Sequence, residues 1–127
     1  MLFDTDVLIW AFRGYSSAQK EIDNDESRFI SAVTYMELIQ GARNKTEQMK
    51  IKKFLHALDF EILPIDENVS HRAVILMEEF ALKSGIQLAD ALIFATACEN
   101  SLCLCSANTK HFKAIASLDT KEFKPGK

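Results

Sequence analysis

Apolar residues recur along this chain with two different spacings. Short apolar runs near residues 1–3, 28–31, 60–65 and 102–105 predict β-strands, and Glu122 and Phe123 are assigned to a last edge strand. Between them, apolar residues recur about every three to four positions, as on one face of an α-helix. The expected helices are 4–12, 16–26, one starting at Ser31 or Thr34, 44–58, 68–84, 86–100 and a short one at 110–115.

Capping residues support several of these helix boundaries. Asp4 or Asp6 can cap the first helix, and Ser16 with Gln19 forms a capping box for the second. Gly85 follows the long helix 68–84, where a glycine commonly ends a helix.

The regular alternation of strands and helices predicts an α/β protein. The expected fold is a three-layer α/β/α sandwich with a central parallel sheet of four to five strands. The run 102–105 is apolar throughout, which is typical of a central parallel strand. The length of 127 residues and the absence of a linker predict a single domain over residues 1–127.

Composition narrows the class of protein. A net charge of -3 excludes a histone-like nucleic-acid binder, although an acidic active site with bound metal remains compatible. The three cysteines show no zinc-site spacing and predict no disulfide framework. The N-terminus does not resemble a signal peptide, and no apolar run reaches the roughly 20 residues of a membrane span. A cytoplasmic protein is expected.

Polar residues follow two of the predicted strands, at the strand ends where an α/β protein binds its ligand. Asp4 comes after the first strand, and Ser106 and Asn108 come after the fourth. Glu37 lies early in the helix after the second strand, and Asp90 lies early in the apolar helix before the fourth. Ligands of open parallel sheets bind outside the carboxyl ends of the strands, where strand order reverses. We therefore expect these five residues at one edge of the sheet.

Each of these residues also has a structural interpretation. Asp4 can serve only as a helix cap, Glu37 can be a solvated helix residue, and Ser106 and Asn108 can be turn residues. Asp90 is the most informative because its helix is otherwise nearly all apolar and no Lys or Arg lies within one turn. A carboxylate there requires a partner distant in the sequence or a metal ion.

A cluster of carboxylates without neighbouring His or Cys favours a hard cation. Mg²⁺ and Mn²⁺ prefer oxygen ligands and keep several waters. Such an ion can activate water, orient a phosphate and stabilise the leaving oxygen. Three acids with one amide and one hydroxyl therefore suit phosphodiester hydrolysis, with Asp4, Asp90 and Glu37 as the candidate metal ligands.

A basic stretch follows the Glu37 helix. It begins with Arg43 and Lys45 and continues to residue 53, and Lys110 adds a further positive charge near Asn108. The ordinary interpretation is a solvated helix face. Its position beside Glu37 also predicts contacts to nucleic-acid phosphates through Arg43, Lys45 and Lys110.

Four segments resemble the PIN-domain family, and specifically its VapC-type toxins. They are LFDTDVLI at 2–9, ISAVTYMELIQG at 30–41, LADALIFATA at 88–97 and LCSANTKHF at 104–112. They occur in the family's order and spacing and extend over nearly the whole chain.

The resemblance implies a parallel-sheet fold, a homodimer and an Mg²⁺- or Mn²⁺-dependent endoribonuclease. It implies catalytic, metal-binding roles for Asp4, Glu37 and Asp90, and a cognate antitoxin protein that covers the site. Ser106 stands where Thr or Ser is common, and Asn108 stands where many relatives have a fourth aspartate. Asp6 is open to two interpretations, an extra carboxylate or only a cap.

Two other classes compete with this interpretation. Asp4-Thr5-Asp6 after the first strand also resembles the start of a haloacid-dehalogenase-type phosphohydrolase, but such an enzyme is expected to have Thr or Val where Leu8 stands. A non-catalytic domain that binds RNA or a partner protein is the second alternative, because Asn108 removes a charge from the site.

Overall fold

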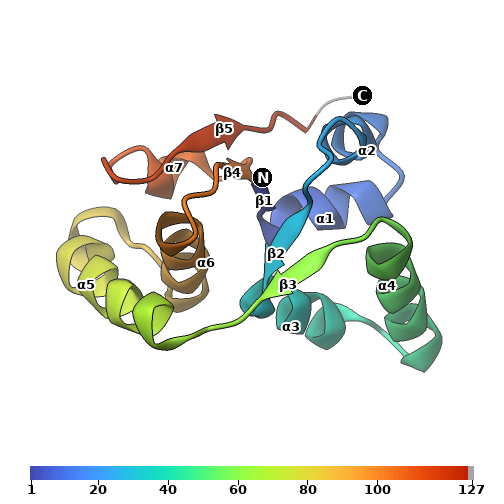
Figure 1. Ribbon diagram of the computed structural model, residues 1–127, viewed down its shortest axis with the longest axis horizontal. Helices are drawn as coiled ribbons and strands as arrows, with labels where there is room; N and C mark the ends of the chain where they lie inside the picture. The colour runs from blue at the N-terminus through green and yellow to red at the C-terminus, as the bar shows by residue number, and fades with distance from the viewer. Residues whose placement is uncertain (126–127) are drawn as a thin grey trace.

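The computed structural model of the protein describes residues 1–125, which form a five-stranded sheet with helices on both faces (Figure 1). The α/β sandwich with a parallel sheet is thereby confirmed. Residues 126–127, the end of the predicted domain, lie outside the described part.

The sheet has the strand order β3-β2-β1-β4-β5, and every neighbouring pair is parallel. The strands β1 and β4 are central neighbours, with Leu2 opposite Leu104 and Phe3 opposite Cys105. The chain continues from β1 to β2 on one side and later returns to β4 on the other, so strand order reverses between β1 and β4. The strand bounds are β1 Leu2–Phe3, β2 Phe29–Ser31, β3 Glu61–Leu63, β4 Leu104–Ser106 and β5 Thr120–Glu122.

Alternation along the strands divides the core in two. Leu2 and Leu104 face one core cluster, whereas Phe3 and Cys105 face the other. All four side chains are fully buried, as expected for central strands covered on both faces.

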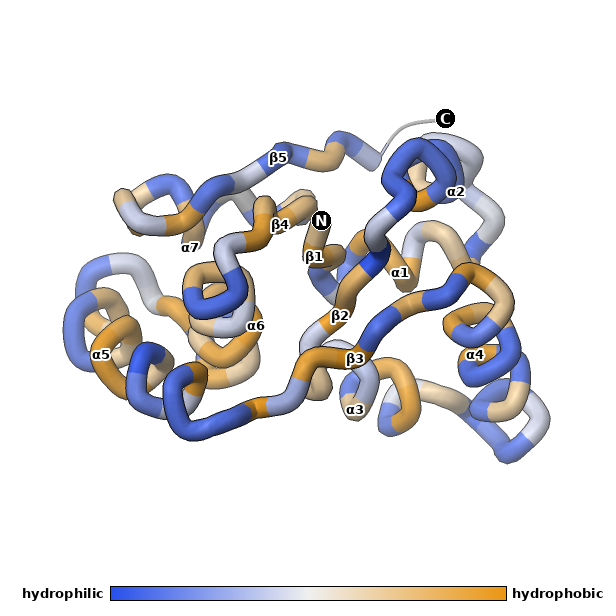
Figure 2. The backbone as a smooth tube through the Cα atoms, viewed as in Figure 1, coloured by the Kyte–Doolittle hydropathy of each residue, from blue (hydrophilic) through white to orange (hydrophobic). Residues whose placement is uncertain are grey.

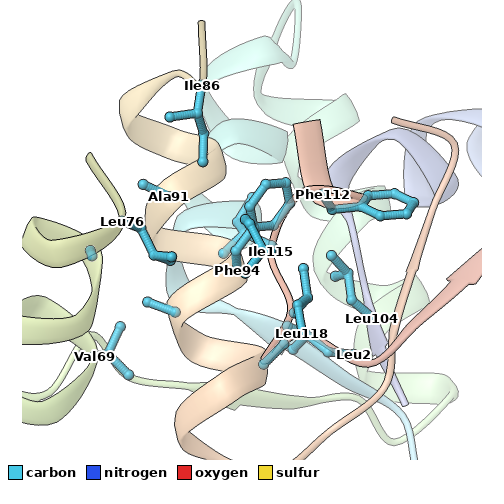
Figure 3. Packing of buried hydrophobic residues seen from close by; sticks show 14 of the residues in the cluster. Leu2, Val69, Leu76, Ile86, Ala91, Phe94, Leu104, Phe112, Ile115 and Leu118 are labelled. Atoms are coloured by element: carbon cyan, nitrogen blue, oxygen red, sulfur yellow. The ribbon is translucent and has the colours of Figure 1, made fainter. Parts of the chain in front are cut away.

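Helices cover both faces of this sheet. Their bounds are α1 Thr5–Phe12, α2 Ser16–Asp23, α3 Ala32–Gly41, α4 Lys45–Ala57, α5 Glu67–Ser84, α6 Leu88–Glu99 and α7 Thr109–Phe112. The helices α5 and α6 lie on one side, and α1, α2 and α4 on the other (Figure 1). Figure 3 shows Phe94 of α6 beside Phe112 and Ile115 of the C-terminal segment, between α5 and the sheet.

The helix ends follow local sequence in most places. Asp4 is the N-cap of α1, and Gly85 ends α5 with a left-handed φ of 69°, as predicted. The helix α5 begins earlier than predicted because the Asp66 carboxylate caps it by accepting the Val69 N–H at 2.8 Å. The capping box at Ser16 was wrong: Tyr15 is the N-cap of α2, without a side-chain cap bond.

The hydropathy of the residues agrees with a sheet that is covered by helices on both faces. In Figure 2 the strands β1, β2 and β4 are coloured hydrophobic, while hydrophilic residues concentrate on the outer turns of α4 and α5. Within residues 1–125, no helix has both the length and the apolar character needed to cross a membrane.

Candidate active site

Asp4 and Ser106 meet at the carboxyl ends of the two central strands. Asp4 directly follows β1, and Ser106 is the last residue of β4. The Ser106 hydroxyl donates to Asp4 Oδ2 at 2.7 Å, and the Thr5 backbone N–H donates to Asp4 Oδ1 at 2.8 Å. Asp4 is only 5% exposed. The predicted meeting of these residues at the reversal point of the sheet is therefore confirmed.

The Asp6 carboxylate also points towards β4. From the sequence, Asp6 was either an extra carboxylate of the site or only a helix cap. Its Oδ2 accepts the Ala107 backbone N–H at 3.0 Å and lies 3.4 Å from the Ser106 hydroxyl. A hydroxyl has one hydrogen, and that of Ser106 is already directed at Asp4 over the shorter distance. Asp6 Oδ1 is buried and has no hydrogen-bond partner among the described residues. Asp4 thus caps α1, and Asp6 brings a second carboxylate to the site.

Asn108 reaches the same place through its backbone. Its N–H donates to the Ser106 oxygen at 3.0 Å, so Ser106 accepts from one neighbour while it donates to Asp4. The Asn108 side chain is half-buried. The turn after β4 is therefore held to the end of β1 by one buried serine.

Burial and mutual repulsion dominate the electrostatics of the aspartates. The pKa of Asp4 is raised from 3.8 to about 7, first by burial and then by the negative charge of Asp6, with a smaller effect from Asp90. The hydrogen bonds from Ser106 and Thr5 oppose this shift. The pKa of Asp6 is also raised, mainly by burial and partly by Asp90. Asp90 therefore lies close enough to act on both carboxylates.

Asp90 itself has partners near and far in the sequence. Burial raises its pKa, while the nearby His111 imidazole and a hydrogen bond with the Gln87 backbone lower it. Gln87 is the N-cap of α6 and Asp90 lies three residues later, the spacing of a capping box. The Asp90 carboxylate was expected to need a partner distant in the sequence. His111 on α7 is such a partner, and the Gln87 backbone adds a local hydrogen bond. His111 Nδ1 is buried without a hydrogen-bond partner in residues 1–125.

Glu37 joins the site through a threonine. The Thr5 hydroxyl donates to Glu37 Oε1 at 2.7 Å and lies 3.0 Å from the Thr34 hydroxyl. Glu37 also lines a pocket of about 590 Å³ between α1, α3 and α4. The contacts of Thr5 and Thr34 were not predicted from the sequence. The only sequence signal was for Thr5, a hydroxyl residue between Asp4 and Asp6.

The oxygen donors at this edge fit a divalent cation in two respects. Asp6 Oδ1 is an acceptor without a donor among the described residues, and three carboxylates with raised pKa values would be stabilised by a positive charge. In the part of the chain that the structure describes, no three His, Cys, Asp or Glu side chains form a ready-made metal site. Joint ligation of one ion by Asp4, Glu37 and Asp90 therefore stays a prediction.

The three predicted RNA-binding residues lie on two segments, Arg43 and Lys45 beside the start of α4 and Lys110 on α7. Arg43 lines the pocket beside Glu37, and its guanidinium pairs with Glu47 at 3.1 Å. Lys45 is exposed at the start of α4, and Lys110 is exposed on α7. Their contact with RNA stays a prediction.

The fold and the site together indicate the class of protein to which this chain belongs. A parallel sheet with acids gathered where strand order reverses is the arrangement of an α/β protein that acts on a ligand at its carboxyl edge. The donor set, all oxygen, favours a hard metal and a phosphate-containing ligand.

The chain belongs to the PIN domain family, whose sequence profile matches residues 1–118. PIN domains form a family of nucleases. No curated protein gives a significant match to the chain.

Solved structures resemble nearly the whole chain. A chain of a toxin–antitoxin complex from Klebsiella pneumoniae is 32% identical with a TM-score of 0.79, over 95% of this chain and 98% of that one. A chain of FitAcB from Neisseria gonorrhoeae is 29% identical with a TM-score of 0.76, over 98% and 96%. VapBC2 from Rickettsia felis, bound to a DNA fragment from its promoter, gives a TM-score of 0.84 at 22% identity over 97% and 98%, a likeness of fold. The resemblance to VapC-type proteins is thus confirmed at the level of family and fold.

Proposed function

We propose that this protein is a metal-dependent endoribonuclease and the toxin of a bacterial toxin–antitoxin pair. One observation carries the proposal: at the reversal point of the sheet, the buried Asp4 carboxylate accepts from Ser106 at 2.7 Å, and an Asp6 oxygen lies 3.4 Å from the same hydroxyl. Burial and the neighbouring Asp6 and Asp90 raise the pKa of Asp4 to about 7. Carboxylates packed together in this way are stabilised when a divalent cation binds. Membership of a nuclease family and the likeness to a toxin–antitoxin complex support the same function.

The roles follow from the contacts of each side chain. Asp4 and Asp90 are the proposed direct ligands of Mg²⁺ or Mn²⁺, and Asp6 Oδ1 is a further acceptor beside them. When bound, the ion would polarise the scissile phosphate and stabilise the leaving oxygen. Glu37 takes a proton from the attacking water, or binds the ion through water. Asn108 orients water or phosphate, and Ser106, whose buried hydroxyl donates to Asp4, acts on them only through Asp4.

The decisive experiment is cleavage of an RNA pool by the purified protein. We expect cleavage with Mg²⁺ or Mn²⁺, loss of cleavage with a chelator, and loss in Asp90→Asn with the fold intact by circular dichroism. Asp23→Asn, at the exposed end of α2, is the matched control and keeps full activity. Full activity in Asp90→Asn would refute the role of Asp90.

The same assay separates the alternatives. RNA binding without cleavage, under all metal conditions, would indicate a non-catalytic binding domain. The haloacid-dehalogenase alternative is set aside by the family match.

We further propose that the cognate antitoxin covers the pocket beside Glu37. Ile9, Phe12 and Leu38 contribute apolar surface to this pocket, and Arg13 and Arg43 lie at it. The Klebsiella pneumoniae relative was solved in a toxin–antitoxin complex. Co-purification with the protein of the neighbouring small reading frame, weakened by Ile9→Asp, is the expected result. Unchanged co-purification of this variant would place the antitoxin elsewhere.

A homodimer is the proposed assembly. Met36 beside Glu37 is 54% exposed and Leu88 near Asp90 is 65% exposed, so large apolar side chains lie in sequence next to the site residues. A dimer interface would remove these side chains from water. Light scattering is expected to give the mass of a dimer, and Leu88→Glu is expected to reduce it. A monomer at all concentrations would contradict this assembly.

A further inference from the structure

Thr5 contacts two of the proposed catalytic acids at once. Its backbone N–H donates to Asp4 Oδ1 at 2.8 Å, and its hydroxyl donates to Glu37 Oε1 at 2.7 Å. Asp4 belongs to the end of β1 and Glu37 to α3, so residue 5 is the covalent and hydrogen-bonded connection between them.

The hydrogen-bond directions follow from the donors available. An ionised carboxylate accepts only, so the single hydrogen of the Thr5 hydroxyl is used for Glu37. The Thr34 hydroxyl is fully buried and lies 3.0 Å from Thr5, where it is an alternative acceptor for the same Thr5 hydrogen. The bond from Thr5 to the Glu37 carboxylate is the shorter of the two, at 2.7 Å, and a carboxylate is the stronger acceptor.

Both threonines suit this positioning. Thr5 is the first residue of α1, and its β-branched side chain has restricted rotation about χ1. Thr34 lies one helical turn before Glu37 on α3, so both acceptors of the Thr5 hydroxyl are carried by the same helix. With Oε1 of Glu37 engaged by Thr5, Oε2 is the oxygen left for water or an ion.

We propose that Thr5 is a positioning residue, which fixes the Glu37 carboxylate relative to Asp4. The inference rests on the proposed nuclease function. Partners that orient the groups around a metal change metal affinity or activity by about 10- to 100-fold when removed. The alternative is that Thr5 only ties α1 to α3 and contributes to stability.

The test compares Mn²⁺ affinity by calorimetry with kcat and KM for RNA cleavage. Thr5→Val keeps the shape and removes the hydroxyl, and we expect about 10-fold or greater loss of Mn²⁺ affinity and of kcat, with KM for RNA unchanged. Thr5→Ser restores the hydroxyl and most of both quantities. Thr96→Val removes another buried hydroxyl, which donates to the Leu92 carbonyl at 2.7 Å, and serves as the control for stability.

A double-mutant cycle separates positioning from a merely structural role. Because Thr5 acts through Glu37, Thr5→Val has no further effect on Mn²⁺ affinity or kcat in the Glu37→Gln background. An equal loss in both backgrounds, or wild-type behaviour of Thr5→Val, overturns the inference while the nuclease remains. Absence of both Mn²⁺ binding and cleavage in the unmodified protein overturns the proposed function and this inference with it.

Discussion

The Ser106 hydroxyl donates to the Asp4 carboxylate across 2.7 Å, although the two residues are 102 positions apart in the chain. The bond joins the ends of the two central strands at the point where strand order reverses. Both partners are buried, since Ser106 is fully inaccessible and Asp4 nearly so. The ionisation of Asp4 therefore depends on a partner from the far end of the chain.

Ser106→Ala is expected to impair metal binding more than folding. Loss of the hydroxyl removes a bond that lowers the pKa of Asp4, so this pKa rises further and the carboxylate binds a cation less readily. We expect Mn²⁺ affinity to fall about 10- to 100-fold. Ser70→Ala, at an exposed position of α5, is the matched control. Equal Mn²⁺ titration curves for the two variants would contradict the role of Ser106.

The metal-free protein is expected to lose stability as pH rises from about 4 to about 7. In this range the unfolded chain releases the Asp4 proton, with a pKa of 3.8, while the folded protein still binds it, with a pKa of about 7. The folded state then carries more protons than the unfolded state, so the free energy of unfolding falls as pH increases. Asp6 and Asp90 act in the same direction because their pKa values are also raised.

Urea unfolding with a chelator present measures this effect. Asp4→Asn is expected to be more stable than the wild type at pH 8, by about 2 to 4 kcal/mol, and nearly equal to it at pH 4. Mn²⁺ stabilises the wild type at pH 8, and its affinity falls below about pH 7 because the ligands must lose their protons. A wild type whose metal-free stability does not change between pH 4 and pH 8 would contradict the raised pKa.

Asp6 and Asn108 are expected to compensate for each other. Asp6→Asn removes the carboxylate with the unpartnered oxygen, which weakens Mn²⁺ binding roughly tenfold and stabilises the metal-free protein. Asn108→Asp adds a carboxylate next to Ser106, which strengthens Mn²⁺ binding and destabilises the metal-free protein. The double variant should approach the wild type in both measurements. If Asn108→Asp fails to recover Mn²⁺ affinity in the Asp6→Asn background, the two positions do not share a site.

Replacement of Arg43, Lys45 and Lys110 by Gln is expected to weaken RNA binding and to reduce its salt dependence. On single-stranded RNA, each phosphate that the protein no longer neutralises makes the slope of log K against log salt shallower by about 0.7. Stability should change little, because the Arg43–Glu47 pair is largely exposed on the Arg43 side. Lys20→Gln with Lys83→Gln, on α2 and α5, controls for charge alone. A slope unchanged from the wild type would exclude these residues from the RNA interface.

Local sequence predicted most of the secondary structure because the signals act within a few residues. The apolar runs predicted the strands, and Gly85 marked the end of α5 because its left-handed φ of 69° suits glycine. The same kind of reasoning failed at Ser16, since a capping motif competes with the turn that precedes it. Gly14 has a φ of 85°, and the Tyr15 N–H bonds back to the Trp10 carbonyl, so Tyr15 and not Ser16 is the N-cap of α2.

What the sequence determined by itself was the order of elements, the parallel sheet and the set of acids placed at its carboxyl edge, because periodicity and strand ends are properties of short segments. The tertiary structure decided which groups touch. It directed Asp6 towards β4, placed His111 near Asp90 and joined Glu37 to Asp4 through Thr5. These contacts depend on how segments distant in the chain pack together, and side-chain direction, burial and the resulting pKa shifts exist only once that packing has formed.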